Sequence, residues 1–282
     1  MCAMCAKKNQ IKVDRFIIPF RVYGTSPKHI VCVNGAQQTM AVWRSFITYF
    51  SDDFSVVTFD FPGQGRAQIV KGGAGVSFEE QLEILRQVIL EASGGTSVYL
   101  FGASWGGIIA AGVAAIYPAL VKKLVLASFG IKPSTELSRV IKDGQKLIAT
   151  GRGNELGHLI TSRFGQHISE VYRKSILQQF EGMNEERFLS FYEHSRFVAQ
   201  IKDINDYVPL SKIAAETLII SGKHDTIIDL DDLGVIARHI PHCKTITIED
   251  AGHFLHFEKP SILHFYREFY ESILPLAAAS SV

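Results

Sequence analysis

The chain has 282 residues, of which 47% are hydrophobic and 20% are charged, and 29 Lys and Arg against 28 Asp and Glu leave a formal charge of +1. This length allows one substantial buried core with a lid. The small net charge argues against a nucleic-acid binder, which normally has a basic excess, and against a long disordered tail.

The 4 cysteines are too few for a disulfide framework, which favours a reducing compartment. No integral membrane association is expected, because the longest run of small apolar residues, 108–117, is about half of the roughly 20 residues that a spanning helix needs. The first ten residues lack the apolar stretch of a secretion signal. We therefore expect a cytoplasmic globular protein.

Short apolar runs alternate with amphipathic stretches along the chain. Such runs are typical of strands that are buried on both faces of a parallel sheet. Residues 78–90 predict a helix with Leu82, Leu85 and Ile89 on one face. This alternation predicts an α/β fold with a mostly parallel, doubly wound sheet. The predicted strands are 30–33, 56–59, 98–101, 124–126, 217–220 and 245–248.

The alternation is interrupted between residues 131 and 208, where the patterns at 140–149 and 171–180 are helical. An insertion of this length exceeds an ordinary connection between strands. We expect a helical cap over the carboxyl ends of the strands, where open α/β sheets bind ligands. Helices that only cover one face of the sheet are the alternative. The predicted organisation is a first core segment, a cap and a second core segment: 1–130, 131–208 and 209–282.

The sequence Gly-Ala-Ser-Trp-Gly at 102–106 lies between the predicted strand 98–101 and the small-residue run that begins at Ile108. Small residues at both ends of this motif allow a tight strand-to-helix turn that holds Ser104 in a strained backbone conformation. The turn places the hydroxyl above a helix N-terminus, whose dipole favours developing negative charge. Ser104 is therefore the predicted nucleophile.

A serine hydroxyl needs a base to accept its proton and a carboxylate to orient that base. In this type of fold the chain order is Ser, acid, His. Asp225 follows the predicted strand 217–220, and His253 follows the predicted strand 245–248. We therefore predict a triad of Ser104, Asp225 and His253. The alternatives are His224 or His256 as the base and Asp229, Asp231 or Asp232 as the acid.

Acyl transfer also requires donors for the oxyanion that forms on the attacked carbonyl. Losing one such donor typically costs about 2.7–4 kcal/mol of transition-state stabilisation. The backbone N–H of Trp105, which follows the nucleophile, is one predicted donor. The N–H of Ala36 is the other, because Asn34-Gly35-Ala36 follows the strand 30–33 and Gly35 lets the backbone approach. A plain Asn-Gly turn is the alternative interpretation.

Together these motifs resemble the α/β-hydrolase superfamily, with Asn34-Gly35 in place of its usual His-Gly and with Asp-Phe-Pro-Gly-Gln-Gly at 60–65. A narrower resemblance is to the RhlA family of rhamnolipid-pathway synthases and to the related 3-hydroxyacyl-carrier-protein:CoA transacylases. It rests on Asn34-Gly35-Ala36, on Ala-Ser-Trp-Gly-Gly at 103–107, on Pro-His-Cys at 241–243 and on Gly-His-Phe-Leu at 252–255.

This narrower resemblance implies a serine acyltransferase that acts through an acyl-enzyme on 3-hydroxyacyl thioesters of carrier protein or CoA. The product would be an ester between two 3-hydroxy fatty acids. The same triad would serve a carboxylesterase or thioesterase with water as the acceptor. A non-catalytic binding protein that keeps the fold is the third alternative.

An acyl chain would be buried by apolar side chains at about 0.8 kcal/mol per methylene. The candidate substrate-binding residues are Asn34, Phe164, Phe188, Tyr192 and Phe254. No cofactor and no metal are expected. Cys2 and Cys5 have the spacing of a metal or redox pair, but no second pair accompanies them.

Overall fold

The computed structural model describes residues 6–272, and in this part of the chain nine strands form one sheet. The strand order is β1-β2-β4-β3-β6-β7-β8-β9, with β5 paired to β2. Strands from β4 across to β9 are parallel neighbours, whereas β1, β2 and β5 pair in antiparallel fashion. The strands are β1 (Ala6–Val13), β2 (Phe16–Tyr23), β3 (His29–Val33), β4 (Ser55–Phe59), β5 (Gln68–Ile69), β6 (Val98–Ala103), β7 (Val121–Ala127), β8 (Glu216–Gly222) and β9 (Cys243–Ile248).

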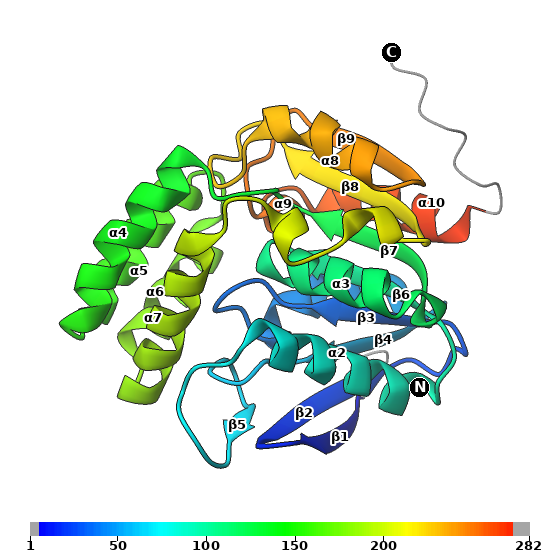
Figure 1. The fold of residues 1–282 in the computed structure, drawn as a ribbon, viewed down its shortest axis with the longest axis horizontal. Coiled ribbons are helices and arrows are strands. Elements are labelled where there is room, and N and C mark those ends of the chain that lie inside the picture. Colours follow the sequence, from blue (N-terminus) through cyan, green and yellow to red (C-terminus); the bar gives the residue numbers. More distant parts are fainter. Residues whose placement is uncertain (1–5, 273–282) are drawn as a thin grey trace.

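The helices of the described residues lie on both faces of the sheet and, as a separate group, beside it (Figure 1). The separate group is α4 to α7, which the chain forms between β7 and β8. The helices are α1 (Arg44–Phe50), α2 (Phe78–Ser93), α3 (Trp105–Ile116), α4 (Thr135–Ala149), α5 (Gly153–Phe164), α6 (Glu170–Glu181), α7 (Glu185–Gln200), α8 (Leu233–His239), α9 (Leu255–Glu258) and α10 (Leu263–Glu271).

The predicted fold class is confirmed, and each predicted strand is present with one or both ends extended. The hairpin of β1 and β2 was not predicted. The side chains of β1 are exposed or half-buried except at Val13, those of β2 are buried or half-buried, and Pro19 lies within β2. Proline removes a backbone donor, so a proline inside an apolar run argues against a strand unless the strand lies near a sheet edge, as this one does.

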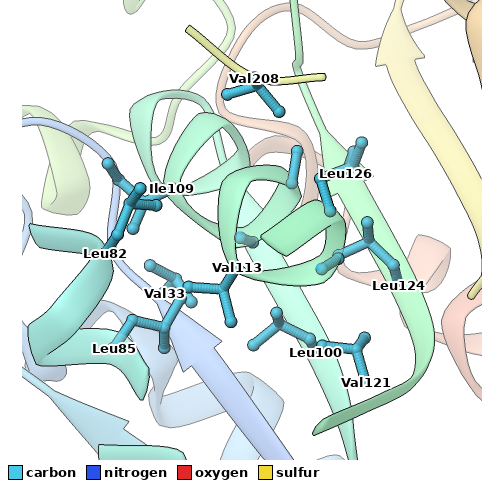
Figure 2. Packing of buried hydrophobic residues seen from close by; sticks show 14 of the residues in the cluster. Val33, Leu82, Leu85, Leu100, Ile109, Val113, Val121, Leu124, Leu126 and Val208 are labelled. Atoms are coloured by element: carbon cyan, nitrogen blue, oxygen red, sulfur yellow. The ribbon is translucent and has the colours of Figure 1, made fainter. Parts of the chain in front are cut away.

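Alternate residues of the central strands pack into two separate clusters. Val31 and Val33 of β3 face the side of α2 and α3, whereas Ile30 and Cys32 face the side of α1 and α10. This explains why the strands have no polar face in the sequence. Figure 2 shows the first of these sides, where helix residues pack on strand residues: Leu82, Leu85, Ile109, Val113, Val33 and Leu100.

Polar caps determine where several helices begin. Ser77 and Glu80 form a capping box at α2, with the Ser77 N–H donating to Glu80 Oε2 at 2.8 Å. The helices beside the sheet use the same device, since the side chains of Ser134, Ser169 and Asn184 accept backbone N–H groups at α4, α6 and α7. Such caps satisfy donors that have no partner within the helix.

Residues 131–208, predicted as a cap, contain all of α4 to α7. The boundary at residue 208 stays a prediction. The last residues of the segment, Ile201, Ile204 and Val208, pack in the buried cluster of the sheet. Within residues 6–272, none of the helices combines the length and the apolar character needed to cross a membrane.

Candidate active site

Ser104 lies at the turn between β6 and α3, with φ 52° and ψ −120°, a conformation that side chains rarely adopt. The turn requires the glycines on either side. A Cβ at Gly102 would lie 2.5 Å from the Gly106 carbonyl oxygen, and a Cβ at Gly106 would lie 2.3 Å from the Val33 carbonyl oxygen. The surrounding backbone therefore imposes the strained conformation that exposes the hydroxyl.

His253 and Asp225 form a buried pair, with His253 Nδ1 2.8 Å from Asp225 Oδ2. A carboxylate accepts hydrogen bonds, so Nδ1 carries the proton and Nε2 remains available as a base. The other oxygen of Asp225 accepts the backbone N–H of Ile227 at 2.8 Å and that of Ile228 at 3.3 Å. The Asp225 side chain has no exposed surface, so these bonds fix the carboxylate and, through it, the imidazole.

The loop that carries His253 is held by two residues that the sequence analysis did not select. Ser128 Oγ donates to the His253 carbonyl oxygen at 2.7 Å. The Glu258 carboxylate accepts the backbone N–H of Gly252 and, at 3.1 Å, that of Phe254. An acid in the first turn of a helix after a loop is a recognisable signal for such a contact.

Ser104 and His253 line one cavity of about 280 Å³ between the carboxyl ends of the strands and the helices α4 to α7. Its lining is mostly apolar, with side chains such as Ile148, Leu156 and Val198. In the described residues no hydrogen bond joins the Ser104 hydroxyl to the His253 ring. Catalytic hydrogen bonds are often long in a free enzyme and shorten when substrate binds.

Both predicted oxyanion donors belong to this cavity. Ala36 lies in the loop after β3, and Trp105 is the first residue of α3. Within residues 6–272 neither backbone N–H donates to another protein group. The loop of Ala36 is closed by Gln38, whose Oε1 accepts the Gly35 N–H at 2.9 Å. Two free donors therefore belong to the cavity that Ser104 lines, and an oxyanion hole needs such donors.

Asn34 does not line the cavity, so the prediction that it contacts substrate is wrong. The side chain is fully buried. Its Nδ2 donates to the Phe59 carbonyl oxygen at 2.9 Å, and its Oδ1 accepts the Trp43 indole N–H at 2.5 Å. Asn34 ties the loop after β3 to the end of β4 and to the start of α1, a structural contact rather than one with substrate.

The predicted aromatic contacts divide in the same way. Phe164 and Phe254 line the cavity, whereas Phe188 and Tyr192 do not. The latter two pack against the small cluster of Ile148, Leu156, Phe180 and Met183 between the helices. The sequence could not tell which face of α7 would be turned to the cavity.

The face of α7 that does line the cavity contains a histidine that the sequence analysis missed. Phe191, His194, Ser195 and Val198 have the spacing of one helix face, and all four line the cavity. Burial lowers the pKa of His194 to about 4, so its imidazole is neutral at neutral pH. The signal in the sequence was this spacing, with one polar ring among apolar side chains.

The alternative bases and acids lie elsewhere. The His256 ring is buried against Trp43 with a centroid distance of 5.6 Å, and that of His224 is stacked on His167 at 5.3 Å. The Asp229 side chain caps the short turn Leu230–Asp232 before α8. None of the alternatives lines the cavity: His224, His256, Asp229, Asp231 and Asp232.

Among residues 6–272 no group of three or more His, Cys, Asp or Glu side chains is arranged to hold a metal ion. Cys2 and Cys5 lie outside the described residues.

A family model described as alpha/beta hydrolase fold matches residues 28–260. An (R)-3-hydroxydecanoyl-ACP:CoA transacylase of Pseudomonas putida is 23% identical over 81% of this chain and 77% of its own length. A 3-hydroxybutyrate-oligomer hydrolase of Cupriavidus necator is 22% identical over 87% of this chain and 89% of its own length.

Among solved structures, an alpha/beta hydrolase enzyme from a Medee basin deep-sea metagenome library is 21% identical. It superposes with a TM-score of 0.81 and covers 94% of this chain and 98% of its own. At this identity the superposition supports the fold. The family match spans most of the chain, including every residue of the cavity described above, and the chain belongs to the alpha/beta hydrolase fold family.

Proposed function

We propose that this protein is a serine acyltransferase that acts on 3-hydroxyacyl thioesters and joins two 3-hydroxyacyl groups in an ester. The observation that carries the proposal is one mostly apolar cavity lined by Ser104 on its strained turn and by His253, which is paired with Asp225 behind it. The relatives named as 3-hydroxydecanoyl transacylases support the substrate class.

In the first half of the reaction, Ser104 Oγ forms a bond to the thioester carbonyl carbon while its proton passes to His253 Nε2. The N–H groups of Ala36 and Trp105 stabilise the oxyanion. The carbon–sulfur bond then breaks, and the thiol of the carrier protein or CoA leaves with the proton from His253. An acyl-enzyme remains.

In the second half, the 3-hydroxyl group of another acyl chain gives its proton to His253 and attacks the acyl-enzyme. Ser104 leaves and recovers the proton. We propose that residues 131–208, with the helices α4 to α7, form a cap. This cap favours the hydroxyl acceptor because its apolar side chains exclude water. Effective molarities of roughly 10⁵ M and above show how a well-oriented bound alcohol competes with bulk water.

A hydrolase is the second candidate, with water in place of the acceptor hydroxyl. The observation that favours it is the relative named as a 3-hydroxybutyrate-oligomer hydrolase, which this chain covers along 89% of its length. Both candidates need the same three side chains and the same oxyanion hole. They differ only in the molecule that attacks the acyl-enzyme.

Incubation of the protein with 3-hydroxydecanoyl thioesters of carrier protein and of CoA, followed by mass spectrometry of the products, separates the candidates. We expect a dimeric ester of 3-hydroxydecanoate. Free 3-hydroxydecanoate without dimeric ester would establish the hydrolase instead. Comparing the two thioesters also identifies the preferred donor.

Ser104→Ala tests whether either reaction uses this site. We expect the rate to fall by roughly four to six orders of magnitude, because the triad acts as a unit. Labelling by a serine-directed fluorophosphonate should disappear in the same variant. Ser162→Ala on the exposed face of α5 is the matched control and should keep both properties. A Ser104→Ala protein with unchanged activity would place the chemistry elsewhere.

A further inference from the structure

His194 of α7 is one of the polar side chains of the cavity whose hydrogen-bonding capacity is unused in the described residues; Gln37, Tyr172 and Ser175 are others. Within residues 6–272 neither ring nitrogen has a hydrogen-bond partner. The residue is half-buried because it lines the cavity. Its ring nitrogens can therefore bond to a polar group that enters the cavity.

Two other polar side chains that line the cavity already have partners. Ser195 Oγ donates to the Tyr192 carbonyl oxygen at 2.8 Å and accepts from Gln145 Nε2 at 3.2 Å. Gln179 Nε2 donates to the Gln37 carbonyl oxygen. These groups stabilise the protein around the cavity, whereas the nitrogens of His194 remain available to a ligand.

The position of His194 is fixed relative to the nucleophile. Its ring packs edge-on against the ring of Trp105, with the centroids 4.6 Å apart. The Trp105 ring is itself anchored, because its Nε1 donates to Gln81 Oε1 at 2.8 Å. Trp105 directly follows Ser104. Ser104, Trp105 and His194 line the same cavity, so a polar group held on this ring can meet an acyl chain that is bound at Ser104.

We propose that His194 is the polar subsite of the acyl pocket, where it binds a hydroxyl group close to the reacting carbonyl and so selects hydroxyacyl over unsubstituted acyl chains. This inference rests on the proposed function and names a residue for its substrate selection. His194 would be a specificity residue, and no proton transfer is assigned to it.

The chemistry of the two groups matches. A neutral imidazole has one nitrogen that donates and one that accepts, and a hydroxyl group can do both. The depressed pKa of His194 keeps the ring in this state at neutral pH. An unsubstituted chain that fills the cavity would cover the nitrogens without giving them a partner and would be disfavoured for that reason.

Gln37 is the rival for this role. It also lines the cavity, and its side chain has no partner within residues 6–272. It lies in the loop after β3, next to the oxyanion donor Ala36. We favour His194 because the Trp105 ring fixes its orientation, but a direct comparison of the two side chains belongs in the experiment.

The test measures the second-order rate constant for release of CoA in the first turnover, when Ser104 is acylated by 3-hydroxydecanoyl-CoA or by decanoyl-CoA, and takes the ratio of the two; this step needs no acceptor hydroxyl. The wild-type protein should prefer the hydroxylated chain. His194→Phe keeps a ring against Trp105 but removes both nitrogens, and it should lower the ratio by roughly tenfold or more. His194→Gln, which retains a donor and an acceptor, should recover part of the ratio and covers the case in which the Phe variant fails to fold.

His158→Phe, at an exposed position of α5, is the matched control and should leave the ratio unchanged. A wild-type ratio near one, or a ratio unaffected by His194→Phe, would overturn the inference. So would a ratio that is lost in Gln37→Leu and kept in His194→Phe. In each of these cases the proposed function stands if Ser104 is still acylated. If neither thioester acylates Ser104, the proposed function itself fails.

Discussion

The sheet and the helices α4 to α7 contribute to the cavity in different ways. Loops at the carboxyl ends of the strands supply Ser104, Asp225 and His253, and dense hydrogen bonds to buried backbone groups hold these residues. The helices supply mostly apolar side chains, and their own buried cluster has only four members in the described chain.

This contrast assigns reaction and selection to separate parts of the molecule. Reacting groups must be placed to within a fraction of an ångström, which only a rigid scaffold achieves. A pocket for an acyl chain needs only apolar surface of suitable shape. We therefore expect changes in the sheet to affect rate or folding, and changes in α4 to α7 to affect the choice of substrate.

Asp225→Asn should have the largest effect. An amide can donate to His253 Nδ1 and would then favour the wrong tautomer, so we expect kcat to fall by about 10⁴-fold with little change in KM. Steady-state kinetics provide the measurement, with circular dichroism to verify folding. Asp229→Asn is the matched control at an exposed position. An Asp225→Asn variant with near-normal kcat would show that His253 is oriented by another group.

Phe101→Ala and Phe180→Ala compare the two regions directly. Phe101 is fully buried among Trp43, Phe46 and Tyr266, so its loss should lower the free energy of unfolding by about 3–5 kcal/mol. Phe180 lines the cavity, so its truncation enlarges an existing space and should cost only about 1–3 kcal/mol.

Urea unfolding measures both losses, and a series of acyl-CoA chain lengths measures selection. Phe180→Ala should shift the preferred chain towards longer acyl groups, whereas Phe101→Ala should leave the preference unchanged. Equal losses of stability in the two variants, with no shift in chain length, would contradict the division between the regions.

His256 gives a smaller effect that depends on pH. It is buried in the core of the sheet, its Nε2 has no partner, and burial lowers its pKa to about 4. An unfolded histidine titrates near 6.5, so between these values the unfolded chain binds a proton that the folded chain does not. The free energy of unfolding therefore has its full value above about pH 6.5. It falls as the pH drops towards 4, by up to about 3 kcal/mol.

Urea unfolding at pH 7.5 and pH 4.5 checks this prediction. His256→Phe should lose less stability between the two conditions than the wild-type protein does. His264→Phe, at an exposed position of α10, should lose as much as the wild type. Equal losses in all three proteins would show that other groups account for the acid sensitivity.

The parts of the fold that could be predicted are those with a strong local pattern. The central strands are apolar throughout because both of their faces are buried, and the glycines at 102 and 106 mark the turn at Ser104. The hairpin of β1 and β2 has a weaker pattern, since most of the β1 side chains are exposed or half-buried.

The residues of the pocket show where local patterns are insufficient. Asn34 was predicted to contact substrate because of its place after β3. Its side-chain amide is instead hydrogen-bonded to Phe59 and Trp43. Phe188, Tyr192 and His194 lie on the same helix, and only the last of the three reaches the cavity. When a helix has aromatic residues on several sides, the side that faces the cavity is determined by the neighbouring helices and not by its own sequence.

The amino-acid sequence by itself determined the parallel strands of the sheet, their order along the chain and the loops that carry Ser104, Asp225 and His253. It could do so because strand burial, tight turns and chain order leave local signatures. The tertiary structure alone decided which side chains of α4 to α7 enclose the cavity and which backbone groups anchor the His253 loop. Those contacts join residues far apart in the chain, and they depend on how the helices pack rather than on any one segment.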